Sequence, residues 1–86
     1  MNGNTRRKFK SIAKVRSVDL KIGKKGMTDT FLNEARTILT KDGMIKFSHT
    51  TSKDNTQELI DKIILLLNAV LVQKVGKTLT FINVEN

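Results

Sequence analysis

The residues with the clearest chemical potential lie in the first third of the sequence, where two glycines enclose two lysines: Gly23, Lys24, Lys25 and Gly26. Glycine tolerates positive φ and, because it has no Cβ, allows another backbone to approach closely. A helix that begins directly after such a loop presents free N–H groups and a positive dipole end, which favour anions. The pattern therefore predicts a loop that holds a sugar-phosphate backbone without reading its bases.

Other chemistry has less support in the sequence. The loop lacks the length and the Lys-Ser/Thr ending of a Walker A motif, and it lacks the third glycine of a dinucleotide fingerprint. The alternative to a binding loop is a tight turn whose lysines serve only solubility. Cysteine is absent, and the single histidine, His49, is expected at an exposed strand end. We find no nucleophile–base set, no pair of acids and no metal-ligand cluster. The sequence predicts a protein that is not an enzyme and has no cofactor or metal.

Positive charge is concentrated near the loop. Residues 1–26 contain nine Lys/Arg and one acid, Asp19, whereas residues 27–86 contain seven residues of each sign, so the net charge of +8 arises in the first third. A basic segment beside a neutral body indicates a polyanionic partner. The candidate binding residues are Arg6, Arg7, Lys10, Lys14, Arg16, Gly23, Lys24, Lys25, Gly26, Thr28 and Lys46.

Hydrophobic periodicity predicts the elements that position these residues. Helices are expected over 6–16, 28–42 and 56–69, with Thr28 as an N-cap and Gly43 as a C-terminal stop. Strands are expected over 18–22, 44–50, 70–75 and 78–84, the last two joined at Gly76-Lys77 by a type II′ turn. The order α-β-α-β-α-β-β predicts an α/β domain over 6–86, with a four-stranded mixed sheet packed with helices. Residues 1–5 are expected to be a flexible N-terminus.

Three separated blocks of this sequence resemble the CRM domain family (chloroplast RNA splicing and ribosome maturation), of the small stand-alone bacterial or archaeal type. The blocks are VDLKIGKKGMT at 18–28, MIKF at 44–47 and LVQKVG at 71–76. The resemblance implies a fold similar to the C-terminal domain of translation initiation factor three, with 23–26 as the RNA-contacting GxxG loop and Lys46 as the lysine of the second strand. The family usually has proline where Val18 stands, glycine where Asn68 stands, and an aromatic-basic ending near Phe81.

The same resemblance implies a partner: structured RNA, above all ribosomal RNA, in a ribosomal subunit or its precursor. The protein would act as an assembly factor or as a component of the ribosome; an intron-splicing accessory has the same chemistry and stays open. Because the chain has no Tyr or Trp, it lacks the sheet-face aromatics of an RRM. Recognition is therefore expected to depend on RNA backbone and shape. Lys46 is expected on the outer sheet face, either solvated or in the RNA surface.

A second function class remains open, a protein-interaction module whose basic N-terminal helix docks on an acidic partner or an anionic surface. The apolar face of that helix is modest, so membrane attachment is not expected. The longest apolar stretch, 63–67, is far too short to span a bilayer, and no signal peptide is evident. We expect a cytoplasmic protein that is monomeric when free.

Overall fold

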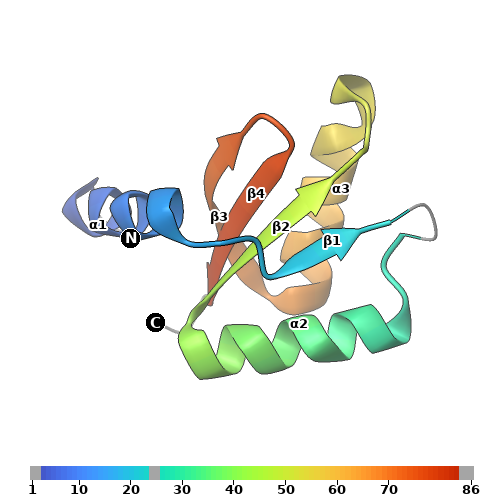
Figure 1. Ribbon diagram of the computed structural model, residues 1–86, viewed down its shortest axis with the longest axis horizontal. Helices are drawn as coiled ribbons and strands as arrows, with labels where there is room; N and C mark the ends of the chain where they lie inside the picture. Colours follow the sequence, from blue (N-terminus) through green and yellow to red (C-terminus); the bar gives the residue numbers. More distant parts are fainter. Residues whose placement is uncertain (1–2, 24–25, 84–86) are drawn as a thin grey trace.

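The computed structural model describes residues 3–23 and 26–83; the side chains of residues 3–7 and of Lys53 are not part of that description. The elements follow the predicted order (Figure 1). They are α1 (Gly3–Val15), β1 (Leu20–Ile22), α2 (Asp29–Asp42), β2 (Met44–His49), α3 (Lys53–Leu67), β3 (Ala69–Val75) and β4 (Thr78–Asn83).

Two helices begin three residues earlier than the sequence pattern predicts. α1 begins at Gly3, so residues 3–5 form its first turn and are not outside the helix. α3 begins at Lys53 after Ser52, which stands at the N-cap, and the Thr56 hydroxyl donates to the Ser52 carbonyl at 2.8 Å. The Ser52 side chain makes no capping hydrogen bond, but serine at an N-cap is a common start signal in sequences, and the predicted boundary overlooked it. α3 ends where Asn68 adopts the left-handed conformation, with φ of 51°.

The four strands form one mixed sheet, as predicted, and their order in the sheet is β1-β2-β4-β3. β1 and β2 are parallel, because α2 connects them, and Ile22 lies beside His49 in their register. β4 runs antiparallel to both of its neighbours. The turn between β3 and β4 has Gly76 at φ of 54° while Lys77 has no positive φ, which fits the predicted type II′ hairpin.

The main core lies between the sheet and the pair of helices α2 and α3. Phe47 of β2 is fully buried at its centre. Its ring centroid lies 5.5 Å from that of Phe31 and 5.9 Å from that of Phe81, a spacing typical of stabilising aromatic pairs. The three phenylalanines thus tie α2, β2 and β4 together, as their positions on core-facing stripes predict.

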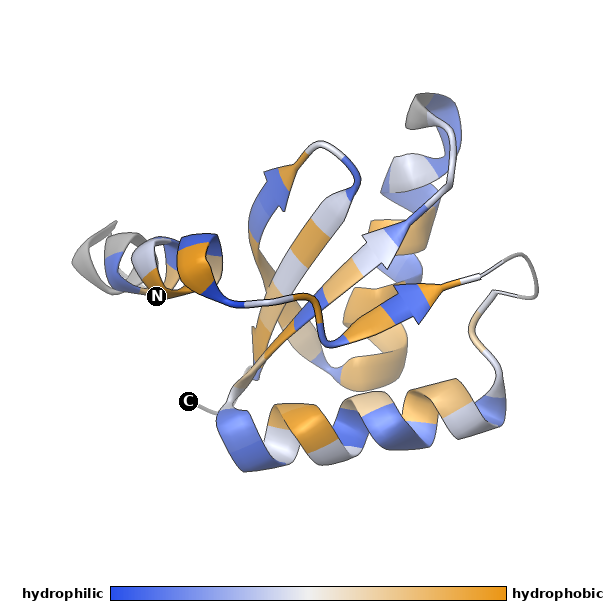
Figure 2. Ribbon diagram, in the orientation of Figure 1, coloured by the Kyte–Doolittle hydropathy of each residue, from blue (hydrophilic) through white to orange (hydrophobic). Residues whose placement is uncertain are grey.

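The opposite face of the sheet carries a smaller core under α1. Phe9 and Ala13 of the helix pack against Met44, Val72 and Ile82 of the strands. In Figure 2, hydrophobic and hydrophilic residues alternate along the central strands and along the coloured part of α1. The sheet is therefore covered by helices on both faces, with α1 as a separate layer.

Candidate nucleic-acid interface

The predicted glycine loop directly follows β1. Gly23 ends the strand, and the Gly26 N–H donates to the Gly23 carbonyl at 3.0 Å, which closes a tight turn. Gly26 has φ of 74°, so its backbone requires glycine, whereas Gly23 has no positive φ. Apart from its chain neighbours, no described residue has a heavy atom within 4 Å of where a Cβ would stand at either glycine. The backbone is open on both sides of Lys24 and Lys25, which lie outside the described residues.

Thr28 caps the helix that follows the loop, as predicted. Its hydroxyl oxygen accepts a hydrogen bond from the Phe31 N–H at 3.1 Å. Asp29 stands in the first turn, where a carboxylate complements the positive end of the helix dipole. The positive end of the α2 dipole is therefore partly compensated by an acid of the same chain.

The sheet topology places three connections along one edge, which we call the strand-end edge: the 23–28 loop, the 50–52 segment and the β3–β4 hairpin. β1 and β2 end side by side, and β4 begins beside Ser48 near the end of β2. The backbone N–H of His49 donates to the carbonyl of Lys77 at 2.9 Å. The Lys77 ammonium in turn donates to the Thr51 carbonyl at 2.8 Å. The hairpin tip is therefore attached to the segment that follows β2.

A cleft of about 410 Å³ lies beside the loop on this edge. It is lined by Lys21, Ile22, Gly23, Ser48, His49 and Thr50. Its walls are the carboxyl ends of two parallel strands, the position at which ligands commonly bind in sheets that contain parallel strands. The sequence pattern did not identify this cleft, because it forms only when β1 and β2 pair.

His49 lies in the wall of this cleft and is buried, with 4% of its surface exposed, so the expectation of an exposed residue is wrong. Its Nδ1 accepts the Thr51 N–H at 3.2 Å. Nε2 has no hydrogen-bond partner among the described residues. Burial, followed by the charges of Lys77 and Lys74, lowers the pKa of the imidazole, so the neutral form is favoured in the folded protein.

Because the imidazole of His49 is buried, we expect the folded protein to lose stability in acid. The unfolded chain binds a proton at His49 below a pH of about 6.5, while the folded chain resists protonation because its pKa is lower. The free energy of unfolding should therefore fall as the pH drops from about 6.5 to the folded pKa. Urea denaturation at several pH values measures this fall. In His49→Gln the fall should be smaller; parallel pH curves for the two proteins would contradict the prediction.

Arg16, a predicted binding residue, occupies a junction between elements. Its guanidinium donates to both carboxylate oxygens of Asp19, at 2.9 and 3.0 Å, and to Asp42 at 2.7 Å. The hydrogen bonds to Asp19 and then to Asp42 hold the pKa of Arg16 above its ordinary value. Only 22% of the side chain is exposed. A phosphate would therefore reach this cation only in competition with two carboxylates.

Lys46 lies on the outer sheet face, as predicted, but it is not a solvated strand lysine. Its ammonium donates to the carbonyls of Ala13 and Arg16, at 3.1 and 3.0 Å. These carbonyls belong to the C-terminal end of α1, where helix carbonyls lack partners and a cation is favourable. Lys46 thus attaches α1 to β2, and the covering helix explains why a half-buried lysine is stable there.

The basic residues of the first third separate into two regions in space. α1, which carries Arg6, Arg7, Lys10 and Lys14, lies at one end of the long axis, and β1 ends toward the other (Figure 1). Lys10 and Lys14 are exposed. The exposed lysines of α1 therefore lie toward the opposite end of the long axis from the end of β1. The structure instead places other exposed lysines on the strand-end edge: Lys21, Lys74 and Lys77.

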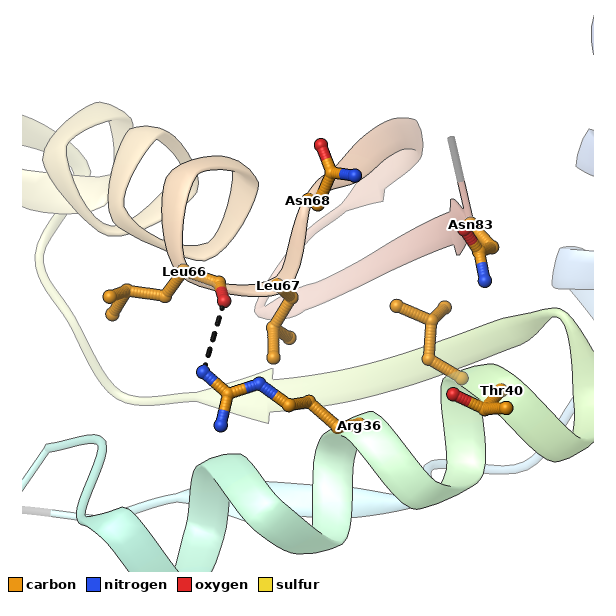
Figure 3. Close-up of a pocket in the computed structure, with 7 residues that line it drawn as sticks. Arg36, Thr40, Leu66, Leu67, Asn68 and Asn83 are labelled. Atoms are coloured by element: carbon orange, nitrogen blue, oxygen red, sulfur yellow. Dashed lines mark hydrogen bonds between the residues drawn. The ribbon is translucent and has the colours of Figure 1, made fainter. Parts of the chain in front are cut away.

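A second hollow lies between the C-terminal halves of α2 and α3, at the sheet edge opposite the loop (Figure 3). Its volume is about 300 Å³. Arg36 crosses it and donates to the Leu66 carbonyl at 3.3 Å, near the C-terminal end of α3, where a cation complements the dipole. The arginine therefore has a structural role in joining the two helices.

The described part of the chain has neither a cluster of metal ligands nor a membrane-spanning helix. Among residues 3–23 and 26–83, no three His, Cys, Asp or Glu side chains gather where they could bind a metal ion. No helix in this part is long and apolar enough to cross a membrane. The acids that do meet basic groups, Asp19 and Asp42, are engaged with Arg16.

Comparison with known proteins gives the family. No protein with a curated description matches the sequence significantly. The fold is similar to the solution structure of the hypothetical protein SAV1595 from Staphylococcus aureus, which is described as a candidate RNA-binding protein; the TM-score is 0.81 and the identity 21%, over 96% of this chain and 88% of that one. The model of the CRS1/YhbY (CRM) domain matches residues 1–82. The chain therefore belongs to the CRM domain family.

Proposed function

We propose that the protein binds RNA through the 23–26 loop. The observation that carries this proposal is the open backbone at Gly23. Neither φ nor packing requires glycine there, so the absence of a side chain serves an approaching partner. Lysines at the adjacent positions would neutralise phosphates, and the described N-terminus of α2 follows directly.

The family supports the same proposal. SAV1595, whose solved structure has a similar fold, is a candidate RNA-binding protein. The resemblance of the 23–26 loop to the GxxG loop of CRM domains points to the same surface. We further propose ribosomal RNA as the partner, with the protein acting in assembly of a subunit or as a ribosomal component. Binding without catalysis is sufficient for either role.

The proposal is tested by the salt dependence of affinity. Fluorescence anisotropy with labelled ribosomal RNA fragments should give an affinity that falls with salt. If about four to six phosphates are neutralised, log affinity against log salt should have a slope of roughly −3 to −5. Transfer RNA of similar length is the matched competitor. A flat salt response would contradict RNA binding through lysines, and equal affinity for transfer RNA would contradict the ribosomal preference alone.

A further inference from the structure

We propose that RNA held by the 23–26 loop continues across the strand-end edge to the β3–β4 hairpin, where Lys74 and Lys77 bind its phosphates. This inference rests on the proposed function. It extends the RNA site to the β3–β4 hairpin, which belongs to the part of the sequence without net charge. Residues 27–86 are neutral in sum, so composition alone does not distinguish these two lysines.

The sheet order supplies the path. From β1 the neighbours are β2, β4 and β3, and adjacent strands lie about 4.8 Å apart. The loop after β1 is thus roughly 15 Å from the end of β3, measured across three strand spacings. A nucleic-acid backbone lying along this edge would meet Lys21 near the loop and the hairpin lysines beyond it, all three exposed.

The hairpin is held in place before any ligand binds. The Lys77 carbonyl accepts the His49 N–H, and the Lys77 ammonium donates to the Thr51 carbonyl. An ammonium has three donors, so this contact leaves capacity for a phosphate oxygen. Because the tip is attached to the segment after β2, binding there requires little further ordering.

The two hairpin lysines also lie near the end of β2. After burial itself, Lys77 and Lys74 are the charges that lower the pKa of His49, and His49 lines the cleft of about 410 Å³ beside the loop. A nucleotide bridging the two regions would lie over this cleft, beside Ser48 and Thr50.

Two matched variants test the inference. Lys74→Ala removes an exposed charge from the strand-end edge. Lys41→Ala removes an exposed charge from the last turn of α2, which comes just before β2 and therefore lies at the other end of that strand. Each phosphate contact contributes about 0.7 to 0.9 to the salt slope. With the ribosomal RNA fragments used above, Lys74→Ala should reduce the slope by about 1 and weaken binding about fivefold at 0.1 M salt. Lys41→Ala should leave both unchanged.

The imidazole of His49 provides a second measurement on the intact protein. Phosphates bound at the hairpin would offset the charges of Lys74 and Lys77, so RNA should raise the pKa of His49 in a ¹⁵N NMR titration. If Lys74→Ala and Lys41→Ala bind alike and the His49 pKa does not move, the hairpin is not part of the site. In that case a loss on replacing Lys24 and Lys25 would still support the proposed function; absence of salt-dependent binding by the unaltered protein would overturn both.

Discussion

Replacing Lys24 and Lys25 by alanine is expected to weaken RNA binding by about 30-fold at 0.1 M salt and to reduce the salt slope by about 1.5. Both effects have one cause: two phosphate contacts disappear, and fewer counterions are released on binding. The difference from the unaltered protein should narrow as salt rises and nearly vanish at 1 M. Anisotropy titrations over a range of salt concentrations measure it.

A control separates a local contact from a general loss of charge. Lys41→Ala combined with Lys62→Ala removes the same total charge from exposed positions on α2 and α3. Its affinity should change much less than that of the loop variant. Equal losses in the two double variants would show that only net charge matters and would contradict a site at the loop.

Gly23→Ala tests the close approach of the RNA backbone. Among the described residues beyond its chain neighbours, none has a heavy atom within 4 Å of a Cβ built at this position, and its φ is not positive, so the melting temperature should stay nearly unchanged. Affinity should nevertheless fall, because the methyl group occupies the space that the ligand needs. Gly26→Ala is a poorer test, since φ of 74° would strain an alanine whether or not RNA binds.

The sequence predicted the elements that position the loop because their signals are local. Alternation over 18–22, the glycine after it and the Thr28 cap depend only on neighbouring residues, and the structure confirms the strand end and the cap. The mixed sheet followed from the order of elements. What local signals did not contain was the position of α1, which packs on the outer sheet face through Phe9 and Ala13.

Lys46 and His49 have surroundings that the local sequence pattern does not contain. The pattern places Lys46 on the correct sheet face, but only the packing of α1 shows that its ammonium donates to the carbonyls of Ala13 and Arg16. His49 follows Ile45 and Phe47 at a spacing of two residues, which places it on the inner face. The period therefore indicated burial, and the expectation of an exposed residue gave too much weight to its position at the strand end.

The strand-end edge was hidden for a related reason. Lys74 and Lys77 come from a segment whose charges cancel in sum, and they approach the loop only through the pairing of β4 with β2 and β3. Summed charge identifies a basic segment, but a surface is assembled from several segments. The strand order, which the sequence did not specify, decides which lysines share the strand-end edge with the loop.

Replacing Asp19 by alanine is expected to lower the free energy of unfolding by about 2 to 3 kcal/mol, the cost of losing several hydrogen bonds of a largely buried carboxylate. Asp19 is the one acid among residues 1–26. It accepts two hydrogen bonds from Arg16, and its Oδ2 also accepts the Lys46 N–H at 2.8 Å. Only 18% of its side chain is exposed. Urea denaturation followed by circular dichroism measures the loss.

Asp19→Asn separates the acceptor from the charge. An amide oxygen can still accept the Lys46 N–H, so this variant should lose less stability than Asp19→Ala, while both weaken the hold on Arg16. Hydrogen exchange should then show faster opening of α1 than of α2 or α3, because the junction of Arg16, Asp19 and Lys46 attaches α1 to the sheet. The contradicting outcome is the behaviour expected of an exposed acid in a protein of net charge +8. In that case Asp19→Ala would leave the free energy of unfolding unchanged within about 0.5 kcal/mol and would strengthen RNA binding. Such a result would show that Asp19 does not position the basic helix.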